Sequence, residues 1–106
     1  MIKMIFLVHR RPGLDRDEFR KYWGETHSEI AKKTPGVLKY IQHHAVPGPD
    51  GEDPPYDGFA EMWWDDAASM QAALETPEGK ATLADLQNFL DLDRQQVFTV
   101  EQITVV

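Results

Sequence analysis

The sequence predicts a single α+β domain, in which a four-stranded antiparallel sheet carries two helices on one face. Four short runs of β-branched and aromatic residues alternate with two segments of helical periodicity. A chain of 106 residues, 42% of them hydrophobic, can bury one core and is too short for two domains. The order of the segments is β-α-β-β-α-β, which is that of the ferredoxin-like fold. We therefore expect one domain over residues 1–106.

The first strand and helix are predicted near the N-terminus. Residues 2–10 are mostly apolar and too few for a core helix, so we expect a strand. Asp15 and Glu18 have the spacing of a helix N-cap with its partner three residues later. Pro35 and Gly36 stop helical structure. A helix is therefore expected from Arg16 to Lys33.

Residues 37–46 and 58–64 form the next two expected strands. The loop between them, residues 47–57, holds four prolines and two glycines. Asp66 is the expected cap of a helix that begins at Ala67, and Thr76 with Pro77 restarts helical structure. The last strand is expected over residues 96–105.

The expected sheet is apolar on both faces. Met4–Val8 contains no polar residue, and Met62, Trp63 and Trp64 are large residues on both sides. Because both helices cover one face, the other face needs a second cover. We expect this cover to be a second copy of the chain related by a twofold axis, which makes the protein a homodimer.

Charge and composition argue against several function classes. The formal net charge of −7 disfavours nucleic-acid binding, and the absence of cysteine excludes disulfides and thiolate metal sites. No apolar stretch is long enough for a signal peptide or a membrane span, and there is no phosphate loop or dinucleotide fingerprint. We expect a cytoplasmic protein that binds neither nucleic acid nor membrane and holds no resident cofactor.

Short motifs along nearly the whole chain resemble those of the EthD family, within the dimeric α+β barrel superfamily. The matching segments are Arg11–Leu14, Glu18-Phe19, Tyr22-Trp23 with His27, Pro35-Gly36 with Tyr40, Asp57–Trp63, Thr76–Gly79 and Asn88–Asp91. The family includes proteins linked to ether degradation, fungal polyketide dehydratases and the similar methylmuconolactone methylisomerases. The resemblance therefore implies a small-molecule pocket in a dimeric domain, without specifying one reaction.

Helical periodicity places His27 at the edge of the buried stripe of the first helix. At about 100° per residue, Phe19 and Trp23 are central, Tyr22 flanks them, and His27 lies about 80° from Phe19. One interpretation is a structural histidine packed on Trp23. The other, which the resemblance favours, is a general base at the rim of a cleft between this helix and the sheet. Trp23 then forms an apolar wall, with plain core packing as its alternative.

Alternation along the second strand places Leu38, Tyr40 and His44 on one face and His43 on the other. The adjacent histidines therefore cannot chelate one metal, and we expect no built-in metal site. Tyr40 matches a family position associated with the pocket, where a phenol donates a hydrogen bond to a carbonyl or enolate oxygen. A core tyrosine is the alternative. His44 is a second candidate acid or base.

Glu61 lies in an otherwise apolar strand, so its carboxylate needs a partner. It either orients a histidine ring, with His27 as the candidate, or forms a structural ion pair with Lys39 or an arginine. The expected pocket lining is Phe19, Tyr22, Trp23, Leu38 and Trp63.

These residues favour a cofactor-independent enzyme, an isomerase, dehydratase or oxygenase, acting on a small carbonyl, lactone or phenolic compound. The expected catalytic residues are His27, Tyr40, His44 and Glu61. Two alternatives stay open. One is a non-catalytic binding or auxiliary dimeric protein, and the other is a haem-binding enzyme with His27 or His44 as axial ligand.

Overall fold

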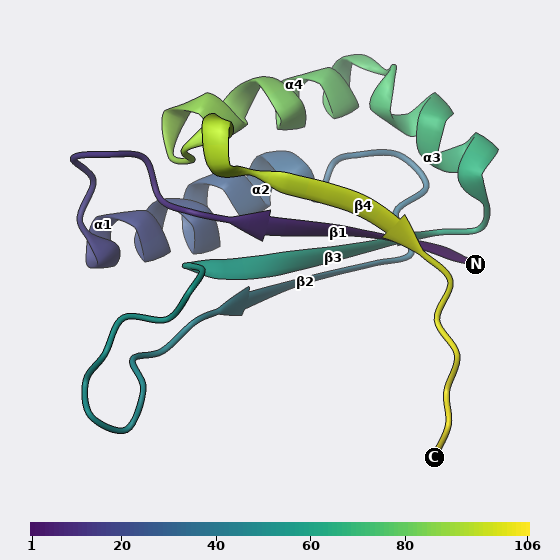
Figure 1. Ribbon diagram of the computed structural model, residues 1–106. Coiled ribbons are helices and arrows are strands. Elements are labelled where there is room, and N and C mark those ends of the chain that lie inside the picture. Colours follow the sequence, from purple (N-terminus) through teal and green to yellow (C-terminus); the bar gives the residue numbers. More distant parts are fainter.

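The protein has two layers, a four-stranded antiparallel sheet and a layer of helices on one of its faces (Figure 1). The structure is a computed structural model that describes all 106 residues. The strands are β1 (Ile2–Val8), β2 (Lys39–His44), β3 (Gly58–Trp64) and β4 (Gln96–Val100), in the spatial order β2-β3-β1-β4. The predicted ferredoxin-like arrangement is confirmed.

The strand register sorts the side chains of the sheet between an inner face, toward the helices, and an outer face. Met4 pairs with Met62 and Phe6 with Ala60, and all four residues are buried on the inner face. Side chains alternate along a strand, so Ile5 and its partner Glu61 lie on the outer face. The inner face forms the core, and the outer face has no covering element within the chain.

The first helical segment is interrupted by a π turn. It consists of α1 (Arg16–Lys21), the π turn Tyr22–His27 and α2 (Ser28–Ala31), which continue one another. The Asp15 carboxylate accepts a hydrogen bond from the Glu18 amide at 2.8 Å, which confirms the predicted cap. The expected helical span of 16–33 is therefore nearly correct, whereas its assumed uninterrupted α-geometry is wrong.

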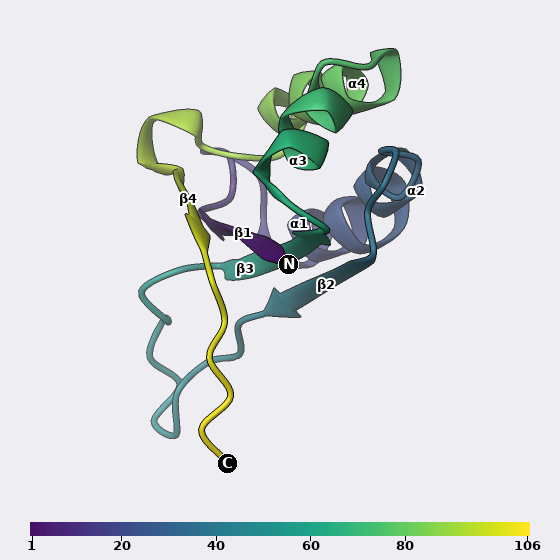
Figure 2. The same cartoon turned by 90° about the vertical axis from the view of Figure 1, so that its right-hand side faces the viewer.

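The second helical region contains α3 (Ala67–Leu74) and α4 (Pro77–Asp85), followed by short 3₁₀ turns at Leu86–Asn88 and Leu92–Arg94. Asp66 caps α3 and Thr76 caps α4 through side-chain oxygens, as predicted. Figure 2 shows both helical regions on the same side of the sheet.

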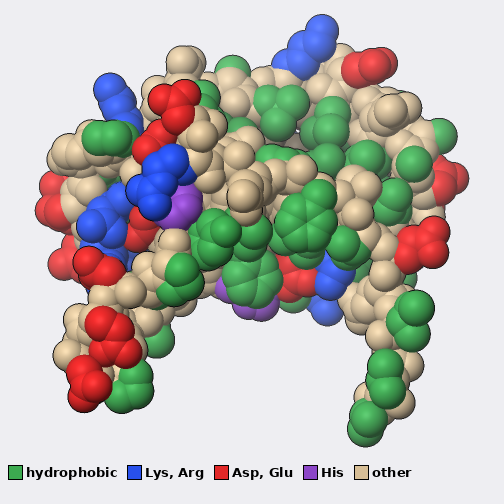
Figure 3. Space-filling model, in the orientation of Figure 1, with side chains coloured by type: hydrophobic (Ala, Val, Ile, Leu, Met, Phe, Trp, Pro, Cys, Tyr) green, Lys and Arg blue, Asp and Glu red, His purple; other side chains and the backbone are tan.

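Three of the four strands are shorter than expected, and only the predicted strand 58–64 is matched at both ends. The first strand stops at Val8, and beyond it Arg10 makes only an isolated bridge with Leu90. The second spans 39–44 instead of 37–46, and the last ends at Val100 because residues 101–106 pair with nothing. These last residues extend away from the body on the side opposite the helices (Figures 1 and 3). None of the helices is long and apolar enough to cross a bilayer.

Candidate functional site

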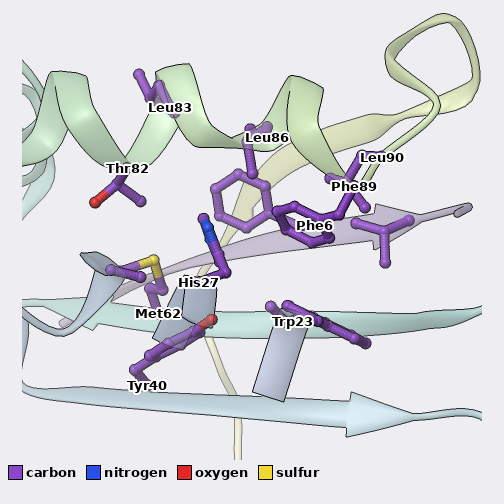
Figure 4. A pocket seen from close by; sticks show the side chains of 13 residues that line it. Phe6, Trp23, His27, Tyr40, Met62, Thr82, Leu83, Leu86, Phe89 and Leu90 are labelled. Carbon is purple, nitrogen blue, oxygen red and sulfur yellow. The ribbon is translucent and has the colours of Figure 1, made fainter. Parts of the chain in front are cut away.

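A narrow apolar cavity lies between the helical layer and the inner face of the sheet (Figure 4). Eleven of its thirteen lining residues are hydrophobic, and the full set is Phe6, Val8, Trp23, His27, Ala31, Tyr40, Ala60, Met62, Thr82, Leu83, Leu86, Phe89 and Leu90. The centres of water molecules fit in about 30 Å³ of it, which is room for about two waters. His27 and Tyr40 bring the titratable groups to this lining.

His27 is held by a buried aspartate. Its Nδ1 lies 2.7 Å from Oδ2 of Asp85, and the two side chains are only 5% and 7% exposed. An ionised carboxylate only accepts hydrogen bonds, so Nδ1 carries the proton and donates it to Asp85. The other ring nitrogen, Nε2, makes no hydrogen bond within the chain. His27 lines the cavity, and Nε2 is the ring nitrogen that remains available as an acceptor.

Two further donors fix the Asp85 carboxylate. Its Oδ1 accepts from the hydroxyl of Tyr22 at 2.6 Å and from Nδ2 of Asn88 at 2.9 Å. Burial raises the pKa of Asp85, but the hydrogen bonds from Tyr22, Asn88 and His27 outweigh it, so the net pKa lies below the ordinary value. Asp85 is therefore ionised at neutral pH and fixes the orientation of the imidazole.

Burial dominates the titration of His27 itself. Burial lowers the pKa of His27, and the hydrogen bond and negative charge of Asp85 raise it, with a net pKa below the ordinary value. The ring is therefore neutral at pH 7. A neutral imidazole with its proton on Nδ1 is a hydrogen-bond acceptor, and a general base, at Nε2.

His27 is more deeply buried than the helical wheel predicts. Only 4% of the residue is exposed, and its ring packs on Phe89 with the ring centroids 4.7 Å apart. A π turn contains about one residue more than an α turn, so it rotates the residues after it relative to an uninterrupted helix. The predicted position at the edge of the buried stripe is therefore wrong, and His27 belongs to the wall of the narrow cavity.

A second polar network lies on the sheet side. Nε2 of Gln42 contacts the hydroxyl of Tyr40 at 2.7 Å and the backbone oxygen of Trp23 at 2.8 Å, and Oε1 of Gln42 contacts Nε2 of His44 at 2.8 Å. The His44 ring packs on Trp23, with centroids 4.3 Å apart. As predicted, Tyr40 and His44 share the inner face, but only Tyr40 lines the cavity.

The ionisable groups of this network differ in their titration. Burial raises the pKa of Tyr40, while hydrogen bonds from Gln42 and Trp23 oppose that effect, so the phenol is protonated at neutral pH. Burial, and then the nearby charge of Arg20, lower the pKa of His44. Figure 4 shows the Tyr40 oxygen directed toward the part of the cavity that Trp23 and His27 line.

Glu61 does not orient His27. Its carboxylate lies on the outer face, where Oε2 pairs with Nζ of Lys3 and Oε1 with Nε2 of His43, each at 2.5 Å. Both alternatives for Glu61 occur, with different partners: it contacts a histidine ring, which is His43 and not His27, and it forms an ion pair, which is with Lys3 and not Lys39 or an arginine. Lys3 and Lys39 lie over the ring of Trp63, at 4.6 and 5.3 Å from its centroid. Trp63 is therefore an outer-face residue and not part of the cavity.

The remaining residues expected in the pocket lie around the cavity without lining it. Phe19 is fully buried in the core, Tyr22 supports Asp85, and Leu38, just before the edge strand β2, is 53% exposed. Trp23 is the one expected lining residue that forms the wall. His43 and His44 point to opposite faces as predicted, and nowhere do three His, Asp or Glu side chains converge as metal ligands would.

Two residues of the site were not among the residues expected from the sequence. Asp85 lies in the last turn of α4, 58 residues after His27, and Gln42 lies between two candidate residues of β2. The α4 residue Asp85 follows Thr82 at helical spacing, so an unexpected carboxylate on the buried face of that helix was the available clue.

Comparisons with known proteins agree with this architecture. A sequence model of the EthD domain matches residues 11–93. The crystal structure of an EthD (ethyl tert-butyl ether d) family protein from Bacillus halodurans superposes with a TM-score of 0.82 and 30% identity, over 97% of this chain and 99% of that one. No functionally curated protein matches the sequence.

Two more distant structures share the fold. A dimeric protein of unknown function with a ferredoxin-like fold, from Bacteroides fragilis, is 13% identical with a TM-score of 0.70, over 95% of each chain. SnoaB, a cofactor-independent oxygenase from Streptomyces nogalater, is 12% identical with a TM-score of 0.66, over 99% of this chain and 95% of that one. The domain match and the Bacillus structure identify the family: this chain belongs to the EthD family.

Proposed function

We propose that this protein binds a small, flat carbonyl, lactone or phenolic compound in the inner cavity and removes a proton from it without a cofactor. One observation carries the proposal. His27 and Tyr40 bring an acceptor and a hydroxyl group to the lining of one apolar cavity. This combination suits a ligand that has an acidic proton next to an oxygen on which negative charge develops.

His27 is the base in this proposal. Asp85 holds the proton on Nδ1, and burial keeps the ring neutral, so Nε2 is ready to accept a proton from the ligand. A positioned general base contributes roughly 10²–10⁴ in rate. As Nε2 takes up the proton, the ring becomes an imidazolium, which the negative charge of Asp85 stabilises.

Tyr40 is the hydrogen-bond donor to the oxygen of the ligand. Its phenol stays protonated, and its bond to that oxygen strengthens as charge develops in the transition state. Loss of one such donor costs roughly 10²–10³ in turnover in other enzymes. The remaining wall, which includes Trp23 and Phe89, excludes water and packs on an apolar ligand.

Binding requires the cavity to widen. Ligand pockets generally measure about 300–1,000 Å³, and the present cavity is far smaller. Leu83 of α4 both lines the cavity and is 41% exposed, so its side chain lies between the interior and solvent. A rotation of this side chain, with a small shift of α4, opens the cavity. The same size argument disfavours haem, because a porphyrin needs a much larger rearrangement.

The proposed activity can be tested without knowing the natural substrate. A base that removes a proton beside a carbonyl also exchanges that proton for deuterium in D₂O. We expect the wild-type protein to catalyse this exchange for at least one member of a panel of small ketones and lactones, followed by NMR.

Matched variants connect the exchange to the site. His27→Gln is expected to abolish it and Tyr40→Phe to slow it, while His9→Gln, which changes a histidine outside the cavity, leaves it unchanged. Exchange that survives in His27→Gln contradicts the assignment. Tight binding of a panel member without exchange supports the non-catalytic alternative instead.

We also propose that the outer face of the sheet packs against a second copy of the chain. Phe98 and Phe59 are 48% and 36% exposed on this face, and Ile5 and Ile41 lie beside them by register. The dimeric Bacteroides fragilis protein has the same fold, which supports the proposal. We expect sedimentation of a dimer at micromolar concentration and of a monomer for Phe98→Glu. A wild-type monomer at that concentration contradicts it.

A further inference from the structure

Gln42 is the centre of the polar network on the sheet side, and its amide can be oriented from its contacts alone. One terminal atom lies 2.7 Å from the hydroxyl oxygen of Tyr40 and 2.8 Å from the backbone oxygen of Trp23. The other terminal atom lies 2.8 Å from Nε2 of His44. The nitrogen and oxygen of a glutamine amide are distinguished by what they contact.

The backbone oxygen of Trp23 decides the orientation. A carbonyl oxygen only accepts hydrogen bonds, so the Gln42 atom beside it must be the NH₂ group. The same NH₂ group contacts Tyr40, and an amide nitrogen only donates. The Tyr40 oxygen is therefore the acceptor in this bond, and the Gln42 oxygen accepts from Nε2–H of His44.

The direction of the Tyr40 proton follows from these hydrogen bonds. Its oxygen receives the Gln42 N–H, and no acceptor within the chain takes the phenolic proton. The hydroxyl hydrogen therefore points away from Gln42, and the open direction for Tyr40 is the cavity that it lines. We propose that Gln42 is a positioning residue that commits the Tyr40 hydroxyl to act as a hydrogen-bond donor to a ligand.

This inference deepens the proposed function and rests on it for its catalytic meaning. With Asp85 fixing the proton of His27 and Gln42 fixing that of Tyr40, the cavity is set to accept a proton at one side and donate a hydrogen bond from the other. Such a site favours ligands that present an acidic C–H or O–H group together with an oxygen acceptor. It disfavours ligands whose only polar group near Tyr40 is a donor, such as amines.

The first test needs no variant. Long-range ¹H–¹⁵N NMR of the wild-type protein reports which ring nitrogen of each neutral histidine carries the proton. We expect His44 to be protonated on Nε2 and His27 on Nδ1. Neutral His44 with an unprotonated Nε2 means that the Gln42 amide is reversed, and it overturns the proposal.

The second test measures the bond to Tyr40 directly. With ¹³C-labelled tyrosine, the Tyr40 signal is titrated in the wild-type protein and in Gln42→Met, which keeps an unbranched side chain but removes the donor. An N–H donor stabilises the phenolate, so the midpoint is expected to shift to higher pH in Gln42→Met. Gln96→Leu is the matched control, because the Gln96 amide contacts Tyr56 and not Tyr40. An unchanged Tyr40 midpoint in folded Gln42→Met overturns the proposal.

These measurements separate the inference from the activity. The NMR signals do not depend on a substrate, so a shift of the Tyr40 midpoint supports the role of Gln42 even if no panel compound exchanges. In the exchange assay, Gln42→Met is expected to lower turnover toward that of Tyr40→Phe, while binding of the same compound changes less.

Discussion

Replacement of Asp85 by asparagine is expected to reverse the polarity of His27 while the protein stays folded. Asn88 donates to Oδ1 of Asp85, so the oxygen of a new amide at position 85 is expected to stay on that side. The NH₂ group then faces Nδ1 of His27 and donates to it. The imidazole proton moves to Nε2, and the ring no longer presents an acceptor to the cavity.

The size of the effect depends on the replacement. Asp85 accepts hydrogen bonds from Tyr22, His27 and Asn88 at 2.6, 2.7 and 2.9 Å. Asp85→Ala removes the acceptor of the buried His27 ring and of the half-buried Tyr22 hydroxyl, at about 1–3 kcal/mol each. The exposed Asn88 amide can donate to water instead, so the expected cost is at least about 2 kcal/mol. Small domains are stable by only about 5–15 kcal/mol. Asp85→Asn keeps an acceptor for two donors and is expected to cost about 1–2 kcal/mol.

Two assays check this prediction. Urea unfolding followed by tryptophan fluorescence, at one protein concentration, gives the change in the free energy of unfolding for both variants. Nitrogen NMR of Asp85→Asn gives the tautomer of His27, which is expected to be protonated on Nε2. Deuterium exchange in this variant is expected to fall by roughly 10²–10⁴. If His27 of Asp85→Asn keeps its proton on Nδ1, or if Asp85→Ala is as stable as the wild type, the proposed role of Asp85 in fixing the His27 proton is refuted.

Three further predictions concern stability and are checked by urea unfolding. The folded-state pKa of His27 lies below its ordinary value of 6.5, so the unfolded chain takes up this proton first; the free energy of unfolding is therefore expected to fall as the pH drops below about 6.5, with a shallower slope in His27→Gln. Gly58→Ala places a methyl group against the backbone oxygen of His43 and the ring of Trp23, and it is expected to cost about 3 kcal/mol. Gly13→Ala meets no atom within 4 Å, so only the left-handed backbone conformation, with a φ of +88°, opposes it, and it is expected to cost about 1 kcal/mol. Asp66→Ala removes the N-cap of α3 and is expected to cost about 1 kcal/mol. The control is Asp65→Ala, which removes a neighbouring carboxylate that caps no helix, and an equal cost for the two variants contradicts the capping role.

The features that the sequence predicted well are local ones. The caps at Asp15, Asp66 and Thr76 depend on a side chain and an amide three residues later, so short motifs reveal them. The strand 58–64 lies between a turn-rich loop and a helix cap, which fixes both its ends. Together with the order of strands and helices along the chain, these local signals predict the correct fold class.

The features that the sequence predicted poorly depend on distant partners or on a local irregularity. Helical periodicity places His27 on the assumption of an uninterrupted α-helix, and the π turn changes its direction. Asp85 reaches His27 only through the packing of α4 against α2, which no single-sequence pattern encodes. The error at Glu61 was avoidable, because alternation with the inner residues Ala60 and Met62 already places it on the outer face.

We propose the inner cavity as the ligand site, with His27 and Tyr40 as its titratable groups. A crystal structure with the panel compound that binds most tightly tests it most directly. We expect electron density for that compound between α4 and the inner face of the sheet, with its oxygen about 3 Å from the Tyr40 hydroxyl and its acidic proton directed at Nε2 of His27. Density at the outer face, or in the separate polar cleft lined by His9, Arg10 and Tyr56, with the cavity unchanged, would contradict the proposal.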